Sequence, residues 1–389
     1  MGQVLSVCLN KMTSLFQKIL TNVKYYTTST SSSTDNGTPP LLKPSMEGNL
    51  AAVEELTAQF FKTNEDDERK KSLRSFVNMS DAAQNTALHG AVFGGHIDVV
   101  KFLVEKCHAD IFEKNNIGCS PIWLAAGYGR VECFQYLFSR IKVASKSSDG
   151  IVQHVFQNEN STGDSPLIAS ASRGHVEICK VLLESSLDDD FQDSKFTENM
   201  LSKENKNGDT PLTVTISNAK DEDDCIKLVN TMLKYDQMVR DEGSESKILN
   251  LSNKKGLTPL LIACERNLPR VITLLLETWK AKLGSDQQGN SPIGIASFCG
   301  NMDAAEAVLK AISSSGGKIE ILNNPNDKGC TPLWLACRTG NSKMTNLLLE
   351  AGADPSLRNE ENISPLEVAE KYKKEEVLKV LNERILADS

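Results

Sequence analysis

A three-residue motif, threonine or serine followed by proline and then by leucine or isoleucine, recurs along this chain and constrains its fold more than any other feature. A serine or threonine side chain can accept a hydrogen bond from the first turn of a helix, and proline fits the first helical position because its missing N–H is not needed there. Seven complete copies, and one with alanine in place of proline, begin at Thr86, Ser120, Ser165, Thr210, Thr258, Ser291, Thr331 and Ser364. Each copy predicts a helix start, and the basic period of about 33 residues is typical of a repeat protein.

The most complete copy, residues 326–359, predicts two helices. Thr331 and Pro332 begin the first helix, and Gly340 ends it because glycine tolerates the left-handed conformation of a C-terminal cap. Apolar residues at helical spacing predict the second helix over residues 342–350. A pair of helices this small cannot bury its own apolar face, so it is stable only when it is stacked on copies of itself.

These units resemble ankyrin repeats. The segments GGHIDVVKFL (residues 94–103) and GHVEICKVLL (residues 174–183) are similar to the second half of the family pattern, and the motif described above is similar to its first half. The resemblance covers the chain after residue 46. It implies an all-α solenoid of about nine helix–turn–helix units with short β-turn fingers, which binds protein partners through a concave face made of turn tips and first helices.

The resemblance also suggests which residues contact a partner, because the variable positions near the ends of the first helices face the concave surface. In this chain these positions hold aromatic residues or arginine, the residue types enriched at interface hot spots. The predicted partner-binding residues are Phe93, Tyr128, Arg173, Arg266, Phe298 and Arg338. His89 and His96 occupy the family's two histidine positions, where the ring bonds backbone between repeats, and Trp123 and Trp334 are expected to fill space between repeats.

Composition and motifs argue against several other functions. The net charge is −8, and the part after residue 46 is more acidic than the whole chain, so binding to nucleic acid is not expected. The ten cysteines show no metal-ligand spacing and are interpreted as reduced thiols of a cytosolic protein. Nucleotide-binding, zinc-protease and hydrolase motifs do not occur. We therefore expect no enzyme activity, no cofactor and no metal.

The first residues, MGQVLS, fit the pattern for N-myristoylation of Gly2. One myristoyl chain binds a membrane only weakly, and Cys8 offers a site for palmitoylation as a second anchor. Apolar residues at helical spacing continue through this segment, and no acidic residue occurs before Asp35. Residues 1–26 are therefore predicted to be a lipid-modified or amphipathic anchor at the cytoplasmic face of a membrane. The alternative is that this helix lies on the first repeat as a cap.

The remaining chain is divided into a linker and a repeat domain. Residues 27–46, rich in serine, threonine and proline, are predicted to be a flexible linker, and residues 47–389 form the repeat domain. Residues 46–61 resemble the second half of a degenerate first repeat. Insertions are expected near residues 139–160, 185–205, 236–254 and 313–324, either as tolerated additions or as part of a recognition surface.

The sequence thus predicts a non-enzymatic adaptor that binds proteins and is attached to a membrane by lipid. Two alternatives stay open at this point. The first is a soluble ankyrin-repeat inhibitor or regulator of an enzyme or transcription factor, and the second is an enzyme whose site lies in the insertions.

Overall fold

The computed structural model describes residues 38–63, 69–145, 156, 158–186, 194–240, 243–314 and 319–387. Gly2, Cys8 and the whole expected anchor of residues 1–26 lie outside the described residues. The folded unit is Pro39–Ser389. Among its described residues, no helix combines the length and the apolar character needed to cross a bilayer.

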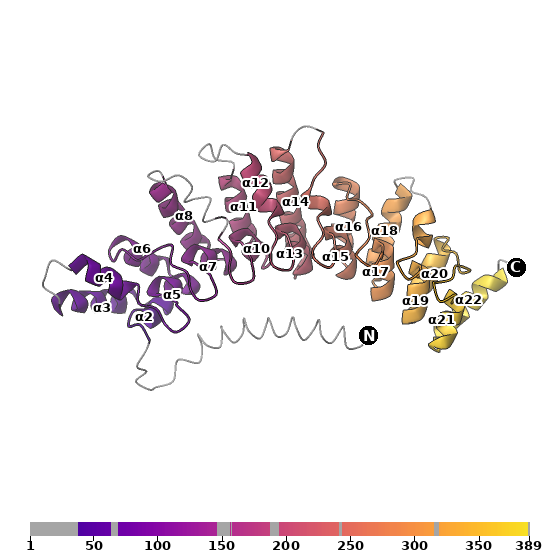
Figure 1. The fold of residues 1–389 in the computed structure, drawn as a ribbon, viewed down its shortest axis with the longest axis horizontal. Helices are drawn as coiled ribbons and strands as arrows, with labels where there is room; N and C mark the ends of the chain where they lie inside the picture. The colour runs from indigo at the N-terminus through magenta and orange to yellow at the C-terminus, as the bar shows by residue number, and fades with distance from the viewer. Residues whose placement is uncertain are drawn as a thin grey trace. The chain divides into compact units, whose positions relative to one another are not determined.

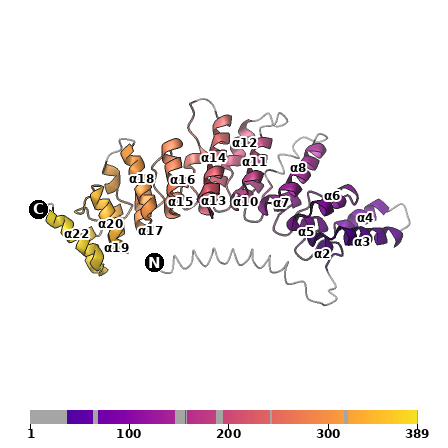
Figure 2. The same ribbon diagram turned by 180° about the vertical axis from the view of Figure 1, so that it is seen from behind.

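The described part of this unit forms nine helix pairs that follow one another in chain order, as Figures 1 and 2 show. The pairs are α2 (Leu42–Met46) with α3 (Leu50–Thr63), α5 (Ala87–Gly94) with α6 (Ile97–Glu105), α7 (Pro121–Gly127) with α8 (Val131–Ser145), α10 (Pro166–Ala171) with α11 (Val176–Ser185), α13 (Pro211–Ser217) with α14 (Glu222–Val239), α15 (Pro259–Glu265) with α16 (Pro269–Thr273), α17 (Pro292–Cys299) with α18 (Met302–Ser314), α19 (Pro332–Thr339) with α20 (Ser342–Glu350), and α21 (Pro365–Lys371) with α22 (Glu375–Ala387). Each first helix packs against the first helix of the next pair. The prediction of an all-α solenoid of about nine units is confirmed.

The first helices begin where the motif predicts. Seven of them have a serine or threonine N-cap followed by proline, and the cap side chain accepts a hydrogen bond from the N–H of the third helical residue. At Thr331, for example, the bond from the Trp334 N–H measures 3.2 Å. In α5, which lacks the proline, the His89 ring closes a capping box with Thr86. The cap residue supplies an acceptor to N–H groups that have no partner inside the helix.

Turns project between the helix pairs and are bonded to one another. In a typical turn, the Asn205 side-chain oxygen accepts from the N–H groups of Asn207 and Asp209, and its side-chain nitrogen donates to Asp164 of the preceding turn at 2.9 Å. Gly208 has φ +77°, and a Cβ at this residue would lie 2.8 Å from the backbone nitrogen of the following turn. The turns therefore pack backbone against backbone, which leaves no room for a side chain at such a position.

The N-terminal boundary of the folded unit differs from the prediction. The expected linker of residues 27–46 extends too far, because Leu42–Met46 forms α2 and packs against α5. Leu41 and Leu42 are buried in this contact. Residues 46–61 were expected to form the second half of a repeat that lacks its first helix. In the structure α2 takes the place of that first helix, so the repeat has both helices.

The expected insertions contribute to the core. The second contains α12 (Ser194–Ser202), and the third and fourth contain the short helices η2 (Ile248–Asn250) and η4 (Ile319–Asn323). Their buried side chains are Phe156, Phe196, Met200, Leu201, Ile248, Leu249 and Leu322. The Phe156 ring lies edge-on to the rings of Phe138 in α8, at 5.6 Å, and Phe196 in α12, at 5.4 Å. The first two insertions are thus joined to each other and to a repeat helix.

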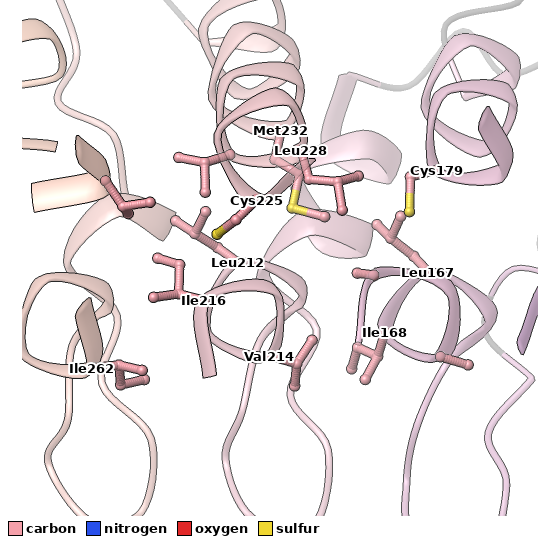
Figure 3. Close-up of a cluster of buried hydrophobic side chains, with 14 of the residues drawn as sticks. Leu167, Ile168, Cys179, Leu212, Val214, Ile216, Cys225, Leu228, Met232 and Ile262 are labelled. Carbon is pink, nitrogen blue, oxygen red and sulfur yellow. The ribbon is translucent and has the colours of Figure 1, made fainter. Parts of the chain in front are cut away.

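The core consists of successive layers, each closed by the next repeat. Figure 3 shows one of them, where Leu212 of α13 and Leu228 of α14 lie between neighbouring helices. Both side chains are fully buried, as is Leu167 of α10. Cysteines share these layers: of the nine described thiols, all free, only Cys299 is exposed. The eight buried cysteines thus pack as small apolar residues.

Candidate functional site

The six residues predicted for partner binding all lie at the end of a first helix or in the turn that follows it. We call this row of helix ends and turns, running from α5 to α21, the inter-helix edge. Arg266 and Phe298 are exposed, and Phe93, Tyr128, Arg173 and Arg338 are half-buried. The residues are therefore accessible in part, but they do not form a single cluster.

Three of them form one group. The Phe93 and Tyr128 rings meet edge to face with centroids 4.8 Å apart, and the Arg173 guanidinium lies 5.1 Å from the centroid of the Tyr128 ring. Arg173 also donates a hydrogen bond of 2.9 Å to the Gly127 carbonyl oxygen. Such cation–π contacts hold a guanidinium in place and add about 0.5 to 1 kcal/mol each at partly exposed sites. Three successive repeats thus share one packed aromatic and cationic group.

A second group lies at the C-terminal repeats and includes a residue that the sequence analysis missed. The Arg338 guanidinium lies between Trp334, 5.7 Å away, and Tyr372, 5.9 Å away, measured to the ring centroids. Tyr372 follows α21 and has an exposed fraction of 47%. Phe298, with an exposed fraction of 41%, borders a shallow hollow of about 460 Å³ between α17 and α20. Exposed aromatic side chains such as these two are suited to anchor a partner.

Arg266 belongs to neither group. Its guanidinium donates a hydrogen bond of 3.0 Å to the Ala219 carbonyl oxygen in the preceding repeat. Arg130 acts in the same way on the Phe93 carbonyl oxygen at 3.0 Å. These bonds satisfy carbonyl groups at the ends of first helices, which have no partner within the helix. Side chains of the inter-helix edge therefore also hold neighbouring repeats together.

The histidines and tryptophans have the structural roles expected for them. The His96 ring bonds the Met46 carbonyl oxygen at 2.9 Å, and the His89 ring bonds the Cys119 carbonyl oxygen at 3.1 Å. Trp123 and Trp334, at the position equivalent to His89, donate to the Asp164 and Ile363 carbonyl oxygens at 2.8 and 3.0 Å. The Cys119, Asp164 and Ile363 carbonyls each directly precede the N-cap residue of the next first helix. An indole N–H therefore replaces the imidazole in the same bond between repeats.

Burial shifts the pKa values of histidine and cysteine side chains in the repeat core away from neutral pH. Burial lowers the pKa of His89 to about 4 and raises the pKa of the Cys179 and Cys337 thiols to about 12. A thiol with a raised pKa is a poor nucleophile at neutral pH. Within the described residues, no three histidine, cysteine, aspartate or glutamate side chains gather in a way that would hold a metal ion.

The acidic run at residues 221–224 has specific partners in the structure. Asp221 caps α14, and the Glu222 carboxylate accepts hydrogen bonds from the N–H groups of Arg270 and Val271, at 2.8 and 3.1 Å. Asp223 pairs with the Arg270 guanidinium at 2.5 Å. A carboxylate at a helix N-terminus is favourable because it satisfies free N–H groups. The run therefore caps α16 of the next repeat.

Two family models and one solved structure are similar to parts of this chain. A family model described as three copies of the ankyrin repeat matches residues 69–149 and 141–242, and a model of a single ankyrin repeat matches residues 328–360. A solved structure described as an ankyrin repeat protein is 19% identical, with a TM-score of 0.44, over 56% of this chain and 96% of that one.

Among curated proteins, the chain is 30% identical over 106 residues to transient receptor potential cation channel subfamily A member 1 of Homo sapiens, which is 27% of this chain and 10% of that protein. It is 29% identical over 121 residues to human ankyrin repeat domain-containing protein 63, covering 30% and 31% of the two chains. A match to the rat mitochondrial liver isoform of glutaminase has 39% identity but only 61 residues, 16% of this chain and 10% of that protein. The chain spans less than a third of each of these relatives.

The two ankyrin models together match more than half of the chain, in the segments where the described helix pairs, helix caps and bonded turns recur. The chain belongs to the ankyrin repeat family.

Proposed function

We propose that this chain is a non-enzymatic adaptor that binds a protein partner through the inter-helix edge and is tethered to the cytoplasmic face of a membrane by lipid at Gly2 and Cys8. Ankyrin repeat proteins are generally protein-interaction modules, and that general role needs no catalytic group. The observation that supports a partner site most strongly is the exposure of two aromatic side chains at the C-terminal repeats, Phe298, which borders the hollow, and Tyr372, which lies next to Arg338. Burying exposed aromatic side chains is a major source of binding energy at protein interfaces.

A photo-crosslinking residue in place of Phe298 tests the docking site. As the matched control, the same residue replaces Met238, which lies in α14 and has an exposed fraction of 67%. In cells, the Phe298 derivative is expected to crosslink a defined protein that the Met238 derivative does not, and a Tyr372→Ala substitution should reduce that product. Equal products from both positions would contradict the docking site.

The membrane tether is supported by the sequence of the first residues. Gly2 and Ser6 fit the myristoylation pattern, and Cys8 lies close enough to provide the second acyl chain that stable attachment requires. The folded unit gives indirect support, because its first layer already consists of α2 and α3, and α3 exposes Glu54, Glu55 and Gln59. A further helix is therefore not required to cover an apolar end of the stack.

The tether is tested by membrane fractionation of Gly2→Ala and Cys8→Ser variants, with the intact mass of the mature protein measured in parallel. We expect Gly2→Ala to move the protein to the soluble fraction and Cys8→Ser to weaken attachment, because one acyl chain alone binds only marginally. A Gly2→Ala protein that stays with the membrane like the unmodified sequence would exclude the lipid anchor and favour the soluble regulator.

A further inference from the structure

Three arginines, one lysine and one histidine lie along the middle of the inter-helix edge. We call them the basic edge: Arg130, Arg173, His175, Lys220 and Arg266. They come from four successive repeats, in the turns after α7, α10, α13 and α15. The chain as a whole has a net charge of −8, so this grouping is opposite in sign to the rest of the molecule.

The three guanidinium groups of the basic edge bond carbonyl oxygens and not carboxylates. Their acceptors are the Phe93, Gly127 and Ala219 carbonyls, at 2.9 to 3.0 Å. Within the described ranges, the arginines whose ion pairs are defined lie elsewhere: Arg74, Arg240, Arg270 and Arg358. A carbonyl bond fixes a guanidinium but leaves its charge uncompensated. The basic edge is therefore held in position with its positive charge intact.

The side chains are close enough to act on one another. Arg173 and His175 bond the same Gly127 carbonyl oxygen, at 2.9 and 3.2 Å. Burial lowers the pKa of His175, and the positive charges of Arg173, Arg130 and Lys220 lower it further, against the opposing effect of the Gly127 bond. The four groups thus lie in one electrostatic field.

The carboxylates nearest to the basic edge in sequence are not paired with its side chains. The acids of the 221–224 run, next to Lys220 in sequence, cap α14 and α16 or pair with Lys227 and Arg270. Glu132, Glu177 and Glu265 lie within two residues of members of the basic edge. None of these three carboxylates takes part in the ion pairs defined for the described residues. The charged groups that shift the pKa of His175 are Arg173, Arg130 and Lys220, so the field at the centre of the basic edge is positive.

We infer that the basic edge, together with Phe93 and Tyr128 beside it, binds a segment of the partner protein that is rich in aspartate and glutamate and carries an apolar side chain. Arginine can bind carboxylates in a bidentate geometry, and the adjoining aromatic pair offers an apolar contact. This inference rests on the proposed adaptor function and adds the chemistry of the partner.

The charge distribution favours a peptide over a larger polyanion. Charges interact strongly only within about 8 Å at physiological ionic strength, so a short segment placed on the basic edge is affected mainly by these five residues. A DNA duplex or an anionic membrane extends over many such lengths and also meets the acidic remainder of the chain. Complementary charge of this kind sets the choice of partner and the rate of encounter.

The test uses the full chain and a selection from a random peptide display library. Charge reversal of the two exposed members, Lys220→Glu with Arg266→Glu, provides the variant. The matched control reverses two exposed lysines of the second helices, Lys101→Glu with Lys180→Glu, and so changes the net charge equally. Lys220→Glu alone is measured as well, because Arg266 also bonds a carbonyl. Thermal unfolding of each variant checks that the stack is retained.

Selected peptides are expected to be enriched in aspartate and glutamate. A synthetic glutamate-rich peptide containing one tryptophan should bind about tenfold more weakly to the double variant, as expected for the loss of a few surface charge contacts. It should bind the control like the unmodified chain and should dissociate at high salt. The Lys220→Glu chain should show a smaller loss in the same direction.

Three results would overturn the inference, and they differ in what they imply for the adaptor function. Neutral or basic peptides that compete at Phe93 and Tyr128 would refute the acidic partner while leaving the adaptor function in place. Failure to select any peptide for this edge would count against both. Tighter binding of a DNA duplex or of phosphatidylserine vesicles, lost in the double variant, would assign the basic edge to a polyanion and not to a protein segment.

Discussion

Replacing Phe156 with alanine tests whether the insertions are a structural part of the repeat stack. The Phe156 side chain is only 3% exposed and touches the rings of Phe138 and Phe196, one from a repeat helix and one from the second insertion. Removing a buried phenylalanine typically costs about 3 to 5 kcal/mol. A hollow of about 520 Å³ borders Phe156 and Phe196, so water can replace part of the lost side chain. We therefore expect a loss near the lower limit, about 3 kcal/mol.

The assay is urea unfolding followed by circular dichroism, together with amide hydrogen exchange of α12. Exchange is needed because repeat proteins lose stability locally, and the cost of the substitution should fall on α8 and α12 before it reaches distant repeats. Val143→Ala is the control, since Val143 also lies in α8 but is 64% exposed. That control should change stability by less than about 0.5 kcal/mol. A loss of unfolding free energy below about 1 kcal/mol for Phe156→Ala, with unchanged exchange in α12, would show that the insertions do not contribute to the stability of the stack.

Three further substitutions test the packing between repeats. Gly208→Ala should destabilise the fold by at least about 1 kcal/mol more than Gly174→Ala in urea unfolding, because both residues have positive φ but only Gly208 has a neighbour within reach of a new Cβ. His89 has a pKa lowered to about 4 by burial, so the unfolded chain binds its proton more readily, and stability should fall by up to about 3 kcal/mol as pH drops from 7 toward 4. His89→Trp should reduce that pH dependence, and an unchanged dependence would place its origin at other groups. Glu222→Ala should speed hydrogen exchange in α16, because the Glu222 carboxylate accepts hydrogen bonds from the first N–H groups of that helix. Unchanged exchange in α16 would show that this cap is dispensable.

Local sequence signals predicted the repeats because each signal acts within one turn of chain. Serine or threonine followed by proline and then by leucine or isoleucine specifies a helix start without reference to distant residues, and each of the seven such motifs in this chain begins a first helix. α2 was missed since its region reads Thr38-Pro39-Pro40-Leu41, with a second proline where leucine is usual. Its identity as a first helix comes from packing against α5, a contact that a sequence motif does not reveal.

Features that depend on contacts between repeats could not be predicted in the same way. The partner of Asp223 in the acidic run could not be read from the sequence, because Arg270 lies a full repeat later. Phe156 lies in a segment without helical periodicity, and its burial depends on rings from two other elements. Tyr372 was missed because its role depends on the Arg338 guanidinium of the preceding repeat, a contact between repeats that only the structure shows.

The basic edge shows why net charge is a poor guide to what a repeat protein binds. Net charge sums over the whole chain, whereas a bound segment is affected only by charges within about one screening length. In this fold, residues about one repeat apart in sequence lie side by side, so Arg173, Lys220 and Arg266 contribute to one surface although 40 or more residues separate each from the next. Acidic residues at other positions of the same repeats contribute to other surfaces or are used as helix caps. An overall negative charge thus argues against long polyanions but leaves a short acidic segment as a suitable partner for this edge.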